Sequence, residues 1–418
     1  MKVKLNYGSG NVEFVIPDNN VASILRSRDL PPLGNVDEAV VKAIREPVGA
    51  PPLKDVADKN TRIALLVSDI TRPCPSYRLL PSLVAELNRY GVSDDHITIF
   101  FATGMRRGHT LGERQKLVGA ALFKRIKTVD HDSHDRANLQ YLGKTERGTE
   151  VTLNKQVLQN DLVIGIANIE IHYFAGYSGG GKSLLPGVAA FETIQQNHSL
   201  MLLPGSEPGK ADGNPVREDI EEAGQIARFG FIVNAVLNKG KEIVKTVAGH
   251  YVEAHRSAVA VNDYMYKTPM EEKADIVVAS AGGSPKDTTL YQAQKGLDNA
   301  SYAVKQGGTI VFIAECAGGM GNKLFAQWLL EANRPEDVVE RLGKGFVLGG
   351  HKAYAIAKLA QNVDISLISR LPEDVVKQSF MTPVATMEGA LTRAFAIHGK
   401  DATVALLPHA DSTLPFIR

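Results

Sequence analysis

The chain has 418 residues, of which 44% are hydrophobic and 22% charged, and its formal net charge is +1. This length and balance predict a globular protein of two or three domains and exclude a disordered or fibrous one. Because nucleic acids and anionic membranes usually require a basic face, the nearly neutral charge gives no reason to expect either as a partner.

Cysteine content and hydropathy indicate the cellular compartment in which the protein works. The only cysteines, Cys74 and Cys316, cannot build a disulfide framework, and we expect both to be small buried thiols. No apolar run reaches the roughly 20 residues that a membrane span needs. Residues 1–16 alternate polar and apolar side chains and lack the apolar core of a signal peptide. We therefore expect a cytoplasmic protein.

The same alternation predicts a β-hairpin, with strands at 2–7 and 11–16 on either side of Gly8-Ser9-Gly10. Further along, short and nearly continuous apolar runs alternate with amphipathic stretches such as 76–90, which we expect to be a helix. Such runs suit the strands of a parallel sheet that helices cover on both faces. They lie at 62–67, 97–101, 161–167, 275–279, 309–314, 365–368 and 403–407.

This order of elements predicts an α/β fold of two doubly wound, Rossmann-like domains with a cleft for cofactor and substrate between them. Residues 250–265 have a helical pattern that Pro269 would end, so we place the domain boundary there. An N-terminal, cofactor-binding domain would span 1–267 and a C-terminal α/β domain 268–399. This division leaves open that the tail, 400–418, packs back on the N-terminal domain.

Reactive residues follow the first of these runs, at the end of a strand, where α/β enzymes usually present catalytic groups. Asp69 and Arg72 stand three residues apart with Thr71 between them. An acid and a guanidinium in this arrangement suit the binding of a phosphate or carboxylate, while Asp69 fixes a hydroxyl. A structural ion pair, with Asp69 capping the next helix, is an equally good interpretation.

The loop after the second run carries Arg106, Arg107 and His109 among glycines. Two arginines beside a histidine form a compact anion site with a candidate proton carrier. A solvated loop is the competing interpretation, and this segment alone favours it.

The richest segment is a glycine-rich loop that contains Lys182 and is flanked by His172 and His198. From Gly176 on, its spacing matches the phosphate loop of nucleotide hydrolases and kinases. Pro186 speaks against such a loop, because it interrupts the helix that should follow, and no strand ends in a convincing magnesium-binding Asp. A glycine-rich loop with a lysine still suits a nucleotide monophosphate, and the lysine can be a covalent nucleophile.

The two flanking histidines suggest one metal ligand or one proton carrier, although a lone histidine is more often structural. Nowhere does the chain carry a dense set of Cys, His, Asp and Glu. A conventional zinc site is therefore not expected, and any metal must obtain most of its ligands from a cofactor.

A fourth group follows the apolar run at 275–279. Its members, Tyr291, Gln292 and Lys295, lie within about one helical turn of each other. An amide and an ammonium at this spacing can reach the same carboxylate. In isolation, a solvated first turn of a helix is the favoured interpretation.

Taken together, these segments resemble the nickel-dependent lactate racemase family. The similarity extends from about Ser68 to about Lys295, and its most specific part runs from His172 to His198. It implies an isomerase, a racemase or epimerase that inverts the hydroxyl-bearing carbon of a 2-hydroxy acid by hydride transfer to and from a nickel-pincer nucleotide. This cofactor is a nickel(II) pyridinium-3,5-bisthiocarboxylate mononucleotide, which other proteins synthesise and load.

The resemblance also implies roles for the candidate residues. Lys182 would hold the cofactor covalently as a thioamide, and His198 would be the single protein ligand to nickel. Asp69, Thr71 and Arg72 would contact the cofactor, and Arg72 also the substrate.

On the substrate side, the resemblance implies that Tyr291, Gln292 and Lys295 hold the carboxylate and that His172 is one of two general acid/base residues. Inversion requires the keto intermediate to rotate, so an anchored carboxylate and nearby proton carriers make chemical sense.

The chain departs from the family pattern at Arg106, where the second catalytic histidine is expected. An arginine stays protonated and cannot serve as an ordinary base. Either His109 takes over the catalytic role, or His172 is the only base, or Arg106 binds an additional acidic group of the substrate. We favour the third explanation combined with one of the others. Arg106 and Arg107 would then suit a dicarboxylate such as malate or 2-hydroxyglutarate.

Two other functions stay open: a phosphate-loop nucleotide hydrolase or kinase, and a family member that catalyses a different reaction with the same cofactor. The sequence leaves the substrate and the oligomeric state open, and a homo-oligomer is compatible with it.

Overall fold

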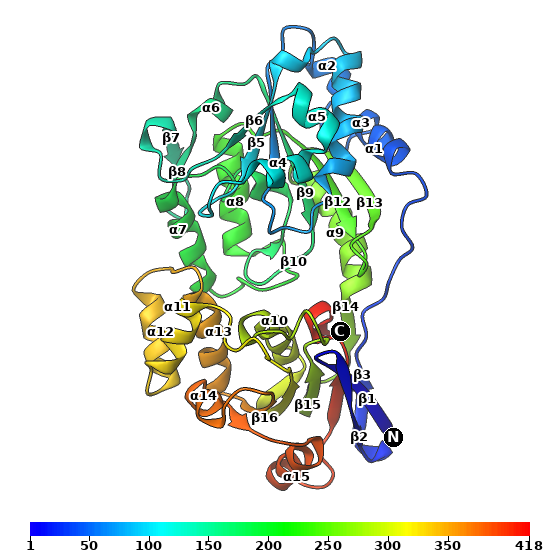
Figure 1. Cartoon of the computed structure of the whole chain (residues 1–418), viewed down its shortest axis with the longest axis vertical. Coiled ribbons are helices and arrows are strands. Elements are labelled where there is room, and N and C mark those ends of the chain that lie inside the picture. Colours follow the sequence, from blue (N-terminus) through cyan, green and yellow to red (C-terminus); the bar gives the residue numbers. More distant parts are fainter. The chain divides into compact units, whose positions relative to one another are not determined.

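The computed structural model describes residues 1–418 and divides into two compact units, each built on a six-stranded sheet (Figure 1). The central unit comprises residues 29–265. The split unit comprises residues 1–28 together with residues 266–418. No helix combines the length and the apolar character that crossing a membrane requires.

This division differs from the expected one at the N-terminus. The first 28 residues belong to the split unit, because β3 (Val21–Ile24) pairs in parallel with β19 (Val404–Leu407). The boundary expected after residue 267 lies after residue 265. Pairing between segments at opposite ends of the chain leaves no trace in local periodicity, so sequence patterns could not reveal it.

The sequence left open whether the C-terminal tail packs back on the N-terminal domain, and in the structure β19 pairs with β3 inside the split unit. Residues 400–418 lie in the split unit, where β19 occupies the main sheet. The last strand, β20 (Leu414–Ile417), pairs in parallel with β14 (Lys267–Met270).

The sheet of the central unit has the strand order β13-β12-β9-β4-β5-β6, and only β13 runs antiparallel to its neighbour. The predicted strands near 62–67, 97–101 and 161–167 are confirmed as β4, β5 and β9. The strands are β4 (Ile63–Ser68), β5 (Ile97–Ala102), β6 (Lys127–Asp130), β7 (Leu139–Lys144), β8 (Glu150–Asn154), β9 (Leu162–Ile169), β10 (Ile171–His172), β11 (Gly176–Tyr177), β12 (Phe231–Leu237) and β13 (Ile243–Gly249). The helices are α1 (Val36–Arg45), α2 (Leu53–Val56), α3 (Ser76–Arg89), α4 (Leu111–Val118), α5 (Ala120–Arg125), α6 (Lys155–Leu158), α7 (Phe191–Ser199), α8 (Pro215–Ile226) and α9 (Glu253–Tyr266).

Helix α3, predicted at 76–90, shows how the apolar runs form the core of the central unit. Leu79 and Leu83 lie four residues apart and therefore on one face of the helix. They are fully buried in the same core as Ile63 and Leu65 of β4. Burial of each such side chain stabilises the fold by about 2 kcal/mol, which explains why a continuous apolar run is required here.

Three loops of the central unit begin at one edge of this sheet. Strand β4 is hydrogen-bonded in parallel to both β5 and β9, so the carboxyl ends of all three strands lie at the same edge. The segments that follow them carry Asp69, Arg106 and the glycine-rich loop. The fold therefore gathers three of the four predicted groups.

In the split unit the sheet has the order β18-β17-β16-β15-β19-β3, with every pair parallel, and the predicted hairpin is confirmed as β1 and β2. The strands are β1 (Lys2–Tyr7), β2 (Gly10–Val15), β3, β14, β15 (Ala274–Ser280), β16 (Val304–Ile313), β17 (Asp364–Ile368), β18 (Thr382–Pro383), β19 and β20. The helices are α10 (Leu290–Ser301), α11 (Lys323–Leu330), α12 (Pro335–Gly343), α13 (Gly350–Ala360), α14 (Glu373–Gln378) and α15 (Met387–His398).

Candidate active site

The loop after β4 is organised by the buried carboxylate of Asp69. Its Oδ1 accepts hydrogen bonds from the backbone N–H and the hydroxyl of Thr71, at 2.9 and 2.5 Å. Its Oδ2 lies 3.1 Å from Nη1 of Arg106 and 3.7 Å from Nε of Arg72. The capping interpretation is wrong, because α3 is preceded by Pro75 and has no side-chain cap. Asp69 instead holds two guanidinium groups of neighbouring loops together.

The other two predicted residues of the second loop are engaged elsewhere. Arg107 donates to both oxygens of Glu113, at 2.8 and 2.6 Å, and so does not join Arg106 in an anion site. Nδ1 of His109 donates to Asp130 at 2.6 Å, and its Nε2 accepts the backbone N–H of Ile70 at 3.1 Å. Both ring nitrogens of this buried histidine are used, so its contacts support a structural role and not the acid/base role that the sequence suggested.

The glycine-rich loop does not have the geometry of a phosphate loop. The strand before it, β11, has two residues, and Gly180–Ser183 form one short 3-10 turn. The next helix, α7, begins only at Phe191. A phosphate loop joins a sheet strand directly to a helix whose amino end faces the phosphates. The phosphate-loop interpretation of this segment is therefore wrong.

The loop does bring its lysine and both flanking histidines to a common aromatic ring. The ring of Phe174 lies 4.8 Å from that of His172 and 5.1 Å from that of His198, each in an edge-on arrangement. Nζ of Lys182 lies 5.8 Å from the centre of the same ring. One amine and two imidazoles thus share one neighbourhood, as the sequence predicted.

Lys182 is a bare amine in a positively charged environment. Nζ makes no hydrogen bond or ion pair with any residue of the chain. Burial, together with the charges of Arg217, Arg72 and Arg106, holds the pKa of Lys182 well below its usual value. A lowered pKa increases the fraction of the amine that is neutral, and the neutral amine is the nucleophilic form because it keeps its lone pair.

His172 is also held in its neutral form. Its Nδ1 accepts the backbone N–H of Ala175 at 3.3 Å. Burial lowers the pKa of His172 well below its usual value, and the nearby charges of Lys182 and Arg72 lower it further. An imidazole that is neutral at pH 7 can take up a proton from a substrate hydroxyl.

His198, at the end of α7, is oriented by a chain of buried polar groups. Its Nδ1 lies 3.1 Å from Oδ1 of Asn197, whose amide nitrogen donates to Asp219 at 2.8 Å. Asp219 also accepts the hydroxyls of Thr145 and Thr149, at 2.6 and 2.8 Å. The amide orientation makes Nδ1 of His198 the donor, so the lone pair of the neutral ring is on Nε2. Metal-binding histidines are commonly oriented in this way.

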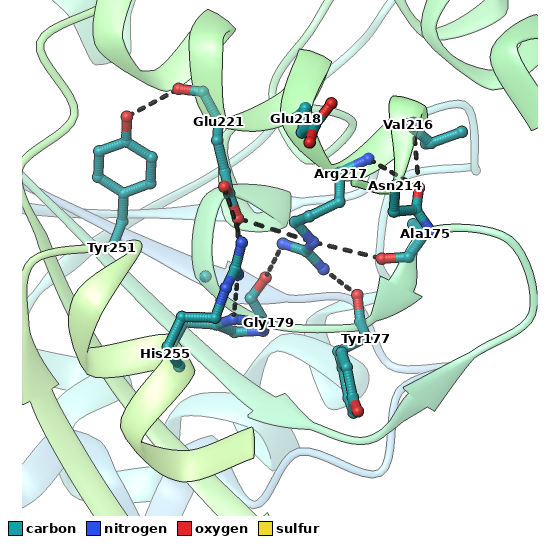
Figure 2. Close-up of polar contacts among 12 residues, drawn as sticks. Ala175, Tyr177, Gly179, Asn214, Val216, Arg217, Glu218, Glu221, Tyr251 and His255 are labelled. Atoms are coloured by element: carbon teal, nitrogen blue, oxygen red, sulfur yellow. Dashed lines mark hydrogen bonds and ion pairs between the residues drawn. The ribbon is translucent and has the colours of Figure 1, made fainter. Parts of the chain in front are cut away.

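Helix α8 supplies residues that the sequence analysis missed. Asp219 supports His198, and Arg217, one turn of chain earlier, contacts the glycine-rich loop (Figure 2). In the sequence, Arg217-Glu218-Asp219 looks like the solvated face of a helix. Only the Asn214-Pro215 pair before it, a typical helix start, gave a local signal, and that signal concerns structure.

The fourth predicted group lies in the split unit, in the first turns of α10. Gln292 and Lys295 are exposed, and Tyr291 is half-buried. Nζ of Lys352, from α13, donates to the carbonyl oxygen of Tyr291 at 2.8 Å and lies 4.4 Å from the centre of its ring. Burial and the charge of Lys295 lower the pKa of Lys352 to about 8. The contact with Tyr291 places Lys352 beside the residues that are predicted to bind the substrate carboxylate.

Both cysteines are free and buried, as predicted. Burial raises the pKa of Cys74 and of Cys316 to about 12, so neither thiol is reactive at neutral pH.

Comparison with known proteins identifies the family. Models of the lactate racemase N-terminal and C-terminal domains match residues 7–209 and 270–414. Lactate racemase of Thermoanaerobacterium thermosaccharolyticum is 33% identical, over 99% of this chain and 98% of its own length. Lactate racemase of Lactiplantibacillus plantarum is 30% identical over 97% of each chain.

Solved structures agree with these matches. The lactate racemase apoprotein from T. thermosaccharolyticum has a TM-score of 0.89 to this structure at 31% identity, with full coverage of both chains. A Thermotoga maritima protein of 16% identity, with a TM-score of 0.64 over 93% of this chain and 100% of its own, shares the fold.

The fold and the site define an α/β enzyme with a lysine in a glycine-rich loop between two histidines. The chain belongs to the lactate racemase family, and it is an isomerase.

Proposed function

We propose that this enzyme inverts the hydroxyl-bearing carbon of a 2-hydroxy acid, using a nickel-pincer nucleotide held by Lys182. The observation that supports the proposal most is the amine of Lys182, which has a lowered pKa and lies with His172 and His198 around Phe174. The name lactate racemase, carried by both curated relatives, supports racemisation of a small 2-hydroxy acid.

The residues of the central unit fit such a cofactor. No three His, Cys, Asp or Glu side chains of the chain are grouped to hold a metal, so nickel would need most of its ligands from the cofactor. His198 would be the single protein ligand, and Lys182 would form the covalent link. Asp69, Thr71 and Arg72 would contact the cofactor from the loop after β4. When bound, the cofactor supplies a ring carbon that accepts and returns a hydride.

The remaining chemistry belongs to side chains of this protein. His172, neutral at pH 7, would remove the hydroxyl proton and later return it. Tyr291, Gln292 and Lys295 would bind the carboxylate, and Lys352 adds a second ammonium beside Tyr291. An anchored carboxylate lets the keto group turn over while the rest of the intermediate stays bound, which is what inversion requires.

We further propose that the substrate is a dicarboxylate such as malate or 2-hydroxyglutarate. Arg106 replaces the expected histidine, and its guanidinium lies at the same edge of the sheet as Lys182, whose pKa it lowers. Nη1 of Arg106 donates to Oδ2 of Asp69 at 3.1 Å, and Arg72 adds a second guanidinium beside the same carboxylate. A planar guanidinium matches a carboxylate, so a second acidic group would find a partner here.

The proposal can be tested on protein expressed together with cofactor-synthesis and loading proteins. We expect an adduct of nucleotide size on Lys182 in the intact mass, nickel by metal analysis, and loss of optical rotation in a panel of 2-hydroxy acids. The matched control is Lys182→Arg, which keeps a cation but lacks the primary amine, and it should carry no adduct.

Two results would direct attention to the alternatives. An adduct without turnover of any 2-hydroxy acid would indicate a different reaction with the same cofactor. Nucleotide binding that depends on magnesium and leaves Lys182 unmodified would contradict the proposal and favour a hydrolase or kinase.

A further inference from the structure

Arg217 is a fully buried arginine whose guanidinium points at the backbone of the glycine-rich loop (Figure 2). Nε donates to the carbonyl oxygen of Ala175 at 3.3 Å, and Nη1 to that of Gly179 at 3.3 Å. Nη2 donates to the carbonyl oxygen of Tyr177. One rigid side chain thus binds three alternate carbonyl groups, and it fixes the path of residues 175–179.

Other groups bind the positions in between. His255 donates from Nε2 to the carbonyl oxygen of Ser178 at 2.9 Å. Oδ1 of Asn234 accepts the N–H of Gly180 at 2.8 Å. Gly180 has a φ of +59°, and a Cβ there would lie 2.9 Å from the carbonyl oxygen of Tyr251. The loop therefore has one backbone path, which leads directly to Lys182.

The charge of Arg217 is only partly neutralised. Its Nε lies 3.9 Å from Oε1 of Glu221. That carboxylate is bound more closely by Arg256, whose Nη1 and Nη2 donate to its two oxygens at 2.8 and 3.0 Å. Burial lowers the pKa of Arg217 to about 10, so the guanidinium is still charged at neutral pH.

This charge acts on Lys182. The charged groups that face the amine are Arg217 from α8, Arg72 after β4 and Arg106 after β5, and after burial Arg217 has the largest effect on its pKa. Arg72 and Arg106 share Asp69 as a counter-ion, whereas the carboxylate nearest Arg217 is shared with Arg256.

We infer that Arg217 is the positioning residue of the glycine-rich loop: its guanidinium fixes the backbone of residues 175–179, and its charge favours the neutral, nucleophilic form of the Lys182 amine. The inference rests on the proposed function only in taking Lys182 as the attachment point. Arg217 touches the loop and not the substrate, so its effect should be seen in the reactivity of Lys182 before any cofactor is present.

The test measures amine reactivity in the full-length chain produced without cofactor-loading proteins. Trace acetylation with acetic anhydride between pH 6 and 10, quantified by mass spectrometry, gives a pH profile for Lys182 relative to the exposed Lys59. In the wild type we expect Lys182 to reach half-maximal labelling at a lower pH than Lys59. This measurement needs no variant, and a Lys182 profile that matches that of Lys59 would overturn the inference.

Arg217→Gln, which keeps a donor for the carbonyls and loses the charge, is the decisive variant. Its half-maximal pH for Lys182 should rise by about one, which lowers labelling about 10-fold at pH values well below the wild-type half-maximal pH. The matched control is Arg256→Gln, which contacts the same Glu221 but none of the loop carbonyls, and its profile should stay near the wild type. If Arg217 only packs against the loop, its replacement should have the opposite effect, because a loosened loop would expose Lys182 and raise its labelling at every pH.

The two proposals fail in different ways. If Lys182 carries a normal adduct in cells with the loading proteins but the labelling profile of Arg217→Gln matches the wild type, the positioning role is wrong and the proposed function is retained. If the profile shifts but no adduct forms under any loading conditions, the proposed function is wrong and the positioning role is retained.

Discussion

Two groups of polar and charged side chains differ in how firmly the protein holds them. The ordered cluster surrounds Lys182 in the central unit, and the open cluster consists of Tyr291, Gln292, Lys295 and Lys352 in the split unit. In the central unit, Lys182 stands at the end of a loop whose carbonyl groups are bound by the fully buried Arg217. In the split unit, Gln292 and Lys295 are exposed, and Lys352 has one backbone carbonyl as its hydrogen-bond partner. This difference agrees with the proposed roles: groups that would hold a resident cofactor are fixed in advance, whereas groups that would bind an exchanging substrate remain exposed to water.

The largest expected effect tests the chemical role of the ordered cluster. His172→Gln should lower kcat by about 10²–10⁴-fold, because it removes the proton carrier, while KM changes little. Steady-state racemisation followed by polarimetry measures both constants. The control is His109→Gln, which should lower Tm and leave the kcat of the folded enzyme close to that of the wild type. Equal losses of kcat in the two variants would make His109 a second proton carrier.

A smaller effect is expected for substrate selection by Arg106 in the ordered cluster. Arg106→Ala should lower kcat/KM for a dicarboxylate about 30-fold more than for lactate, because a charge-assisted hydrogen bond contributes about 2 kcal/mol. Parallel kinetics with malate and lactate give the ratio. Arg107→Ala, which removes a side chain paired with Glu113, should leave the ratio unchanged. If Arg106→Ala reduces both rates in the same proportion, the selecting role is wrong.

The open cluster is tested by its pH dependence. Because the pKa of Lys352 is about 8, its ammonium is present below pH 8 and is lost above it. Substrate KM should therefore rise above pH 8, and Lys352→Met should raise KM about 10-fold at pH 7 and abolish that rise. Lys358→Met, an exposed lysine on the same helix, is the matched control. A wild-type KM that is flat up to pH 9.5 would contradict a role for Lys352.

The smallest effect concerns the stability of the ordered cluster in acid. Burial holds the pKa values of His172 and His255 well below 6.5, so both are neutral when folded and become protonated on unfolding. The stabilisation is thus complete above pH 6.5 and is lost as the pH falls, by about 1.4 kcal/mol per pH unit for each histidine. Urea unfolding between pH 5 and 7.5 measures this slope. His255→Gln should reduce this slope by the contribution of about one proton, which is about 1.4 kcal/mol per pH unit. An unchanged slope would show that His255 is not held neutral in the folded protein.

How far the sequence predicted the structure depended on whether the signal was local. The hairpin, the strands β4, β5 and β9 and the helix α3 follow from apolar periodicity, because burial of one face or of both faces leaves that pattern. The grouping of Lys182, His172 and His198 was implied by the family resemblance of the segment 172–198. Such features are encoded within single continuous segments of the chain.

Contacts between distant segments could not be predicted in this way. His109 was taken as a candidate base because the carboxylate that binds it, Asp130, lies on another strand. Arg217 and Asp219 were missed because buried and solvated charges look alike in a helix until their partners are known. The position of β3 beside β19 was missed for the same reason.

The placement of β3 has a consequence for biosynthesis. Its only neighbour in the main sheet, β19, leaves the ribosome almost four hundred residues later, whereas the central unit is a continuous segment. The nascent chain can complete the central unit while β3 still waits for its partner. Premature termination near the end of translation would therefore leave β3 unpaired, so the loss of residues at one end of the chain would affect a strand near the other end.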